Sequence, residues 1–225
     1  MNKLTEKKSY LPSYTLSEEL INSISHGVGA ILSVAALVLC VIQSAINGTA
    51  WGVVSSCIYG SSLIVLYCMS TLYHAITNKT ARKVFRVFDH TSIFFLIAGT
   101  YTPITLVTLR GPLGWVIFGI VWGAAALGIV LNAISIEKFK RFSMICYIGM
   151  GWAVVIGIKS VIQKMPGMGL MFLVLGGVLY TGGIIFYALK KYKYMHCVWH
   201  MFVLAGSIMH FFCIYFYVLP EKLLA

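Results

Sequence analysis

The sequence is poor in charged residues and poorer still in acidic ones. Asp, Glu, Lys and Arg make up 10% of its 225 residues, and Asp89 is the one aspartate. A soluble domain carries about 25% charged residues, so this composition excludes an ordinary soluble protein. The six cysteines form no Cys-x-x-Cys pair and lie within or beside apolar stretches. Disulfides and a thiolate metal site are therefore not expected.

Hydrophobic residues make up 60% of the chain, and the mean hydropathy is +0.90. They gather in seven apolar runs, at roughly 23–46, 51–76, 87–109, 113–134, 142–163, 167–189 and 195–218. Each run is about as long as the ~20 residues that a helix needs to cross a bilayer, and the runs are continuous rather than alternating, which argues against a β-barrel. The sequence predicts an all-α integral membrane protein with seven transmembrane helices.

Three segments follow from these runs. Residues 1–22 form a polar amino-terminal segment that includes the start of the first helix, 23–218 form the transmembrane domain, and 219–225 form a short tail. Thr15-Leu16-Ser17-Glu18 has the pattern of a capping box, so the first helix is expected to begin before it enters the bilayer. The first twenty residues lack the apolar core and small-residue cleavage site of a signal peptide, so we expect no cleavage there.

The basic residues predict the orientation. Thirteen of the 17 lie at the amino terminus and in alternate loops: Lys3, Lys7, Lys8, Lys79, Arg82, Lys83, Arg86, Lys138, Lys140, Arg141, Lys190, Lys191 and Lys193. By the positive-inside rule the amino terminus is cytoplasmic and the carboxyl terminus, after seven crossings, is extracytoplasmic. The net charge of +11 is then explained by lysines that face anionic lipid headgroups, and no nucleic-acid partner is expected.

Histidines and acids gather at one end of the predicted spans. On this topology six residues lie toward the cytoplasmic side, although they belong to four different helices: His26, His74, Asp89, His90, His196 and His200. Such residues are rare in membrane spans because their desolvation is costly, so a set of them at one depth predicts a functional site.

Spacing favours a metal ion at this site. His196 and His200 are four residues apart, so both imidazoles project from one face of a helix. A third histidine from another helix would complete a three-imidazole set with an open fourth position, as in catalytic zinc sites. His26 and His74 lie at equal depth, and the sequence leaves open which one is the third ligand. In the alternative without a metal, the histidines hydrogen-bond one another or backbone carbonyls, or lie in the wet interface.

Glu19, Asn22 and His26 share one face of the first helix. We interpret them as residues that do not bind the ion themselves but orient a ligand or close the cytoplasmic mouth of the site, with an amphipathic surface turn as the alternative for Glu19. Two other histidines are not expected to be ligands. His90 points about 100° away from Asp89 on the same helix, so we expect it in the membrane interface or as a supporting residue behind the ligands. His210 lies ~15 Å beyond His200, too far to join the site, where a packed or hydrogen-bonded histidine is expected.

These motifs resemble the progestin and adipoQ receptor family. The resemblance rests on Glu19-x2-Asn22-x3-His26, on Ser70-x3-His74 followed by Asp89, and on His196-x3-His200. The segments FDHTSIFFLIAGTYTP (88–103) and HCVWHMFVLAGS (196–207) are similar to the family's bacterial branch, haemolysin III. The resemblance implies a seven-helix fold with a cytoplasmic amino terminus and a zinc ion held by His74, His196 and His200. It also implies that Asp89 holds a zinc-bound water, that Ser70 supports the site, and that, as in the related alkaline ceramidases, the activity is hydrolysis of a lipid amide.

The chemistry also follows from the residue types. Zinc on three imidazoles lowers the pKa of a bound water and polarises a carbonyl, while a carboxylate such as Asp89 accepts a proton. Ser70 either donates a hydrogen bond to an oxyanion or bonds to the carbonyl one turn back. An acyl amide or ester that enters sideways from the bilayer is the expected substrate.

Three classes of function follow. The first is an intramembrane zinc hydrolase of membrane lipids. The second is a receptor-like regulator of membrane homeostasis with structural zinc, and the third, from the family name, is a cytolysin. A channel or carrier is disfavoured, because ionisable residues are nearly absent from the outer halves of the spans. The open coordination position favours the enzyme.

Overall fold

The structure is a computed structural model that describes residues 11–12, 14–189 and 191–221. In this part of the chain every regular element is a helix, and seven stretches are long and apolar enough to cross a membrane. The predicted seven-helix fold is confirmed. Residues 1–10 and 222–225 of the predicted end segments, and Lys190 of the orientation argument, lie outside the described residues.

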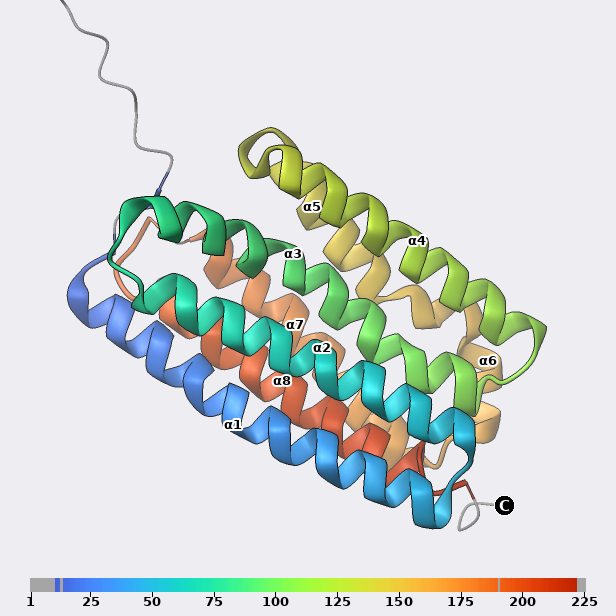
Figure 1. Cartoon of the computed structure of the whole chain (residues 1–225). Helices are drawn as coiled ribbons and strands as arrows, with labels where there is room; N and C mark the ends of the chain where they lie inside the picture. The colour runs from blue at the N-terminus through green and yellow to red at the C-terminus, as the bar shows by residue number, and fades with distance from the viewer. Residues whose placement is uncertain (1–10, 13, 190, 222–225) are drawn as a thin grey trace, which may run out of the picture.

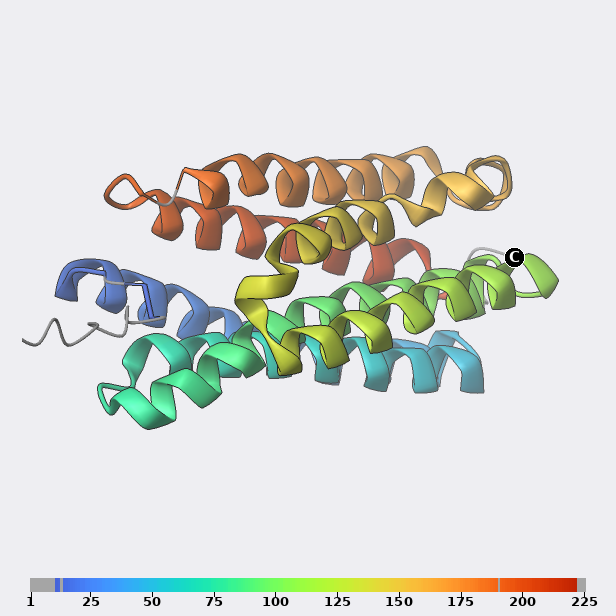
Figure 2. The same ribbon diagram turned by 90° about the horizontal axis from the view of Figure 1, so that it is seen from above.

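The seven spans follow one another around the bundle. They are α1 (Leu16–Asn47), α2 (Ala50–Ala75), α3 (Lys79–Pro103) with the π-helical turn η1 (Ile104–Thr108), α4 (Pro112–Ile134), α5 (Ile136–Gly151) with the 3-10 turn η2 (Ala153–Gly157) and α6 (Ile158–Lys164), α7 (Gly167–Ala188) and α8 (Met195–Tyr217). Consecutive spans pack against each other, and α8 also packs against α1, which closes the bundle (Figures 1 and 2).

Several helices begin earlier than the apolar runs that predicted them. The capping box is confirmed: the Glu18 N–H donates to Thr15 Oγ1 over 3.4 Å, and the Thr15 N–H donates to Glu18 Oε2 over 2.9 Å. Helix α3 and the fifth span likewise begin before their apolar runs, and their first turns carry charged residues such as Arg82 and Glu137. A helix can continue beyond the hydrocarbon core, where charged side chains reach water. These first turns place charged groups beside the candidate site.

Irregular backbone occurs at two neighbouring places in the bundle. Pro103 lies at the end of α3 and is followed directly by η1. The fifth span breaks after Gly151, where the Tyr101 hydroxyl donates to the Gly151 carbonyl over 2.8 Å and accepts from the Val154 N–H over 2.9 Å. Backbone groups freed inside a membrane need such partners. Tyr101 thus supplies them at this break.

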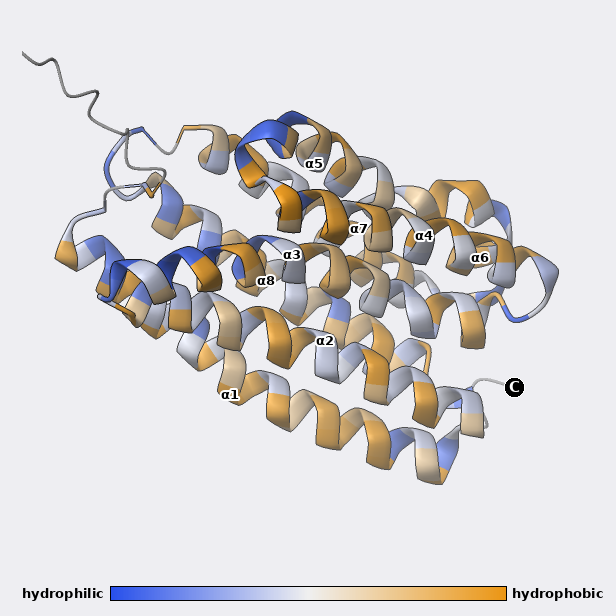
Figure 3. Cartoon of the chain, turned by 45° about the horizontal axis from the view of Figure 1, so that its top comes forward, coloured by the Kyte–Doolittle hydropathy of each residue, from blue (hydrophilic) through white to orange (hydrophobic). Residues whose placement is uncertain are grey.

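The outer surface of the bundle is apolar. Ile31, Ile134 and Ile145 are each about 70% exposed, at 73%, 69% and 71%. Figure 3 shows that the hydrophilic segments lie mainly near the ends of the helices, while orange, hydrophobic residues cover their middles. Exposed apolar faces of this length have to be covered by lipid. The chain is a multi-pass membrane protein.

Candidate metal centre

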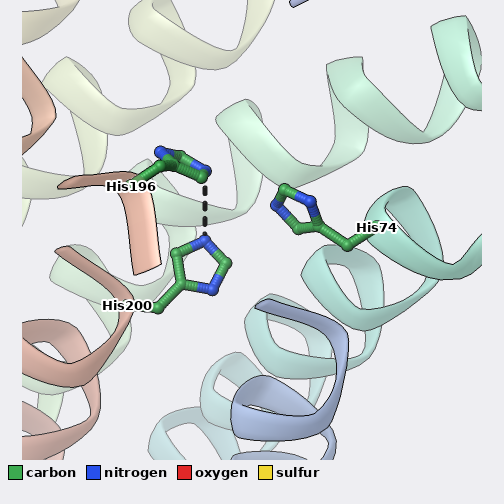
Figure 4. A group of neighbouring side chains, drawn as sticks. All are labelled: His74, His196 and His200. Carbon is green, nitrogen blue, oxygen red and sulfur yellow. Dashed lines mark hydrogen bonds between the residues drawn. The ribbon is translucent and has the colours of Figure 1, made fainter. Parts of the chain in front are cut away.

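Three buried histidines from two helices meet at one end of the bundle. His74 lies in the last turn of α2, and His196 and His200 lie in the first turns of α8. One ring nitrogen of each lies within 4.8 Å of one nitrogen of the other two (Figure 4). All three side chains are at most 6% exposed. The arrangement could hold a metal ion.

The two histidines of α8, His196 and His200, approach each other through their Nε2 atoms. A hydrogen bond joins these atoms over 3.2 Å (Figure 4), as the alternative without a metal predicts. Zinc bonds to imidazole of about 2.0–2.1 Å in tetrahedral geometry set nitrogen atoms about 3.3 Å apart. This edge of the histidine triangle therefore already has the length that a tetrahedral ion requires.

His74 is oriented by an acidic residue of α1. Its Nδ1–H donates to Glu19 Oε2 over 2.6 Å, and the other carboxylate oxygen of Glu19 accepts from Arg82. Because a carboxylate only accepts, Nδ1 carries the proton and Nε2 keeps its lone pair. His74 Nε2 is buried and has no hydrogen-bond partner among the described residues. A free lone pair aimed at two other imidazoles is what a metal ligand presents.

His26 reaches the same cluster in another way. Its ring stacks on that of His200, with centroids 3.7 Å apart and an angle of 16° between the planes, and it meets the edge of Tyr67. A stacked ring presents its face rather than its nitrogen atoms to its neighbour. The geometry therefore favours His74 over His26 as the third ligand, and His26 as a support for His200.

Asn22 lies on the same buried face of α1 as His26. It is fully buried, at 0% exposure, and its amide makes no hydrogen bond to a described residue. Of the three α1 residues predicted to support the site, Glu19 and His26 thus contact histidines of the cluster. A role for Asn22 stays a prediction.

A small cavity with several polar side chains in its wall lies beside the histidines. Its free volume is about 50 Å³, enough for a few water-sized groups, and Ser70, Asp89 and His90 line it together with His196 and His200. The Asp89 side chain is 15% exposed, and His90 Nδ1 lies 3.4 Å from its carboxylate. His90, expected in the interface or as a supporting residue, lines this cavity beside Asp89.

The hydroxyl of Ser70 is buried. It makes no hydrogen bond to the carbonyl one turn back, which was its alternative partner, and it lies beside the carboxylate of Asp89 as a hydrogen-bond donor. Asp89 and Ser70 thus face the space next to two of the candidate ligands, as the sequence predicted. Their roles in catalysis stay predictions.

Two residues of the site were missed from the sequence. Tyr14 stacks on His196, with centroids 5.0 Å apart and an angle of 16° between the planes, and burial raises the pKa of its phenol well above the ordinary value. Arg82 contacts Glu19. Tyr14 directly precedes the capping residue Thr15, which was the available signal, and Arg82 was assigned only to the basic loop.

His210 and the cysteines lie outside the centre. His210 Nε2–H donates to the Leu173 carbonyl over 3.2 Å, as expected for a packed histidine. The Cys197 thiol points to the carbonyl of Glu18 at 3.7 Å. Among the described residues, the group with the geometry of a metal site is the three-histidine set.

Comparisons with known proteins agree on one family. A family model described as "Haemolysin-III related" matches residues 14–211. The chain is 45% identical over 217 residues to "Hemolysin-3" of Bacillus cereus, covering 96% of this chain and 99% of the relative. It is 44% identical over 204 residues to "Hemolysin-3 homolog" of Bacillus subtilis (91% and 96%). The human "Monocyte to macrophage differentiation factor" is 28% identical over 209 residues (90% and 85%). These matches span both the histidine motifs and Asp89.

Proposed function

The chain belongs to the haemolysin-III-related family, and from this premise we propose that it is an intramembrane zinc hydrolase that cleaves amide or ester bonds of membrane lipids. The observation that carries the proposal is the position of Asp89, whose carboxylate lines the same small cavity as His196 and His200. A metal site with a purely structural role needs no acidic side chain in a cavity beside the ligands. A hydrolytic site needs one, because a proton has to be taken from water.

The donor set supports zinc. Neutral imidazole is a common zinc ligand, and three of them leave a fourth coordination position open, as in catalytic sites. When bound, zinc would polarise a carbonyl oxygen and make water a better nucleophile near neutral pH. His74, His196 and His200 would hold the ion, and Glu19 would keep the Nε2 lone pair of His74 directed toward it.

Asp89 and Ser70 would act on the substrate from the other side of the cavity. Glu19 pairs with His74 and Arg82 and does not line the cavity, whereas Asp89, beside His90, does; Asp89 would therefore accept a proton from the attacking water and return it to the leaving group. The Ser70 hydroxyl, which lies beside Asp89 and lines the same cavity, would turn to donate a hydrogen bond to the oxygen of the scissile carbonyl. Both roles require that the reacting bond lies within this cavity.

A second cavity suggests what the rest of the substrate is. It has a free volume of about 90 Å³ and an almost entirely apolar wall. Six residues line both cavities: Leu66, Ile93, Tyr147, Ile184, Trp199 and Val203. A hydrocarbon chain gains free energy by lying against such a wall, while its polar end stays at the histidines. The pair of adjoining cavities therefore fits an acyl lipid better than a water-soluble amide.

Lysis of membranes is the second candidate function, since two relatives carry haemolysin in their names. Hydrolysis can account for lysis if the cleaved lipids weaken the membrane. Lysis would then depend on Asp89. Direct pore formation would not.

The experiment that tests the proposal is lipid mass spectrometry of membranes that contain the wild-type protein or the Asp89→Asn variant. We expect a lipid cleavage product that depends on the wild-type protein and falls by roughly 10²–10⁴-fold in the variant, the usual effect of removing a general base. Zinc content is measured in parallel, because Asp89 is not assigned as a ligand and the variant should keep the ion.

Two results would contradict the proposal in different ways. Normal product formation by Asp89→Asn would remove the general-base role. Unchanged lipids under all conditions, together with a phenotype that depends on the zinc ligands, would favour the membrane-homeostasis regulator. Lysis that persists in Asp89→Asn after the product is lost would separate the haemolytic effect from hydrolysis.

A further inference from the structure

One aromatic ring from outside the helical bundle covers the histidine cluster. Tyr14 precedes α1, and its ring lies nearly parallel to that of His196, with centroids 5.0 Å apart. The same ring is tilted toward His74, at 5.9 Å between centroids. Tyr14 thus contacts one candidate ligand from each of the two helices that supply them. It does so at the end of the bundle that is predicted to be cytoplasmic.

The backbone on both sides of this contact is held by one carboxylate. Glu18 Oε2 accepts from the Thr15 N–H over 2.9 Å, directly after Tyr14. Glu18 Oε1 accepts from the Tyr194 N–H over 2.8 Å, two residues before His196. Glu18 is 6% exposed, so water does not readily replace either bond. The segment that carries Tyr14 and the turn that leads to His196 are therefore both hydrogen-bonded to the carboxylate of Glu18.

The conformation of Tyr194 shows that this turn is constrained. It has φ 64° and ψ −3°, the left-handed region that residues other than glycine rarely adopt. Such a conformation persists where surrounding contacts hold it. The bond from its N–H to Glu18 is one of these contacts, and it fixes the start of α8, where His196 lies in the first turn.

From this geometry we infer that Tyr14 is a positioning residue of the metal centre, which fixes the imidazole plane of His196 by stacking and closes the centre toward the predicted cytoplasmic side. A stacked aromatic neighbour restricts the rotation of the imidazole about its side-chain bond. The same ring keeps water and soluble chelators from the ligand nitrogens. The inference rests on the metal-binding part of the proposed function and is independent of hydrolysis.

Release of zinc from the purified full-length protein in detergent tests this inference. The zinc-loaded protein is mixed with an excess of a chromophoric chelator, and the rate of zinc transfer is measured. Tyr14→Ala should release zinc at least about tenfold faster than the wild type, because the imidazole of His196 is then neither stacked nor covered by an aromatic ring. Tyr14→Phe keeps the ring and should stay within about twofold of the wild type.

Two further variants separate positioning from a general loss of structure. Tyr14→Leu keeps apolar bulk but cannot stack, so it should release zinc faster than Tyr14→Phe even if the alanine variant does not fold. Tyr192→Ala is the matched control, because Tyr192 is 56% exposed at the same end and makes no ring contact with a described histidine. The visible absorption of cobalt-loaded protein should change in Tyr14→Leu and remain unchanged in Tyr192→Ala.

The outcomes are distinct. Wild-type release rates and cobalt spectra in Tyr14→Ala and Tyr14→Leu would overturn the inference, as would equal acceleration by Tyr192→Ala. A wild-type protein that takes up no zinc would refute the metal centre and this inference together. If the lipid experiment shows no cleavage product, the zinc release rates still test the role of Tyr14, and only the proposed hydrolase activity is contradicted.

Discussion

Replacing Glu19 by Gln should weaken zinc binding without removing a ligand. In the wild-type structure Glu19 accepts the Nδ1 proton of His74 over 2.6 Å, which leaves Nε2 free for the metal. A glutamine has nearly the same size, but it carries no charge and can also donate its N–H to Nδ1. His74 would then lose the carboxylate that raises its basicity and fixes its tautomer. Arg82 would lose its charged partner in the same step.

The expected size of this effect follows from burial. Loss of such an outer partner usually weakens metal affinity by roughly 10–100-fold, or about 1.4–2.8 kcal/mol. The His74 side chain is 0% exposed and that of Glu19 is 12% exposed, so water cannot easily replace the carboxylate. We therefore expect a loss near the upper end, roughly 100-fold in Kd. Competition against a chelator of known affinity at fixed pH measures it.

Glu137→Gln is the matched control for this prediction. Glu137 pairs with Arg86 by a salt bridge of 2.5 Å and is 44% exposed, and it makes no contact with the three histidines. The Glu137→Gln variant should bind zinc with a Kd within about threefold of the wild-type value, because a partly exposed ion pair contributes little to stability. Removing a ligand, as in His200→Ala, gives the lowest zinc affinity with which the Glu19→Gln variant is compared. If Glu19→Gln binds zinc as tightly as Glu137→Gln, the carboxylate of Glu19 does not determine the tautomer and basicity of His74.

The seven spans could be predicted from the sequence because hydrophobic length is a strong local signal. The exact starts of α3 and the fifth span could not, since their first turns carry charged residues that lower the local hydropathy. The capping box at Thr15 was the one local signal that placed a start correctly. The orientation rests on the distribution of lysines and arginines and stays a prediction.

The depth of the polar residues could also be predicted, but their directions could not. His26 and His74 lie at equal depth, and only the packing of α1 against α2 and α8 decides which ring presents a nitrogen atom and which stacks. His90 shows the same limit. A single helix places it about 100° from Asp89, yet the cavity extends far enough around α3 for both residues to line it.

Tyr14 could not have been found by periodicity, because it lies before the first residue of α1. Its place depends on Glu18, which joins the cap of α1 to the turn before α8 across most of the sequence. A capping residue marks where a helix begins. The residue before it can fold back over the end of the bundle, and this position merits inspection in a membrane protein whose polar site lies near that end.

Two further predictions concern topology and packing. A reporter fused to the carboxyl end should be extracytoplasmic, since seven spans follow a cytoplasmic amino terminus; a cytoplasmic signal would contradict either the span count or the orientation. Gly128→Ala should lower the free energy of unfolding by about 1–3 kcal/mol. The added Cβ would lie 2.2 Å from the ring of Phe94, which is 0% exposed and cannot move aside. Gly119→Ala on the same helix has nothing within 4 Å of the added Cβ, so it should be neutral or stabilise by up to about 1 kcal/mol. Thermal unfolding in detergent compares the two variants, and equal melting temperatures would show that α3 and α4 are not packed as closely as described.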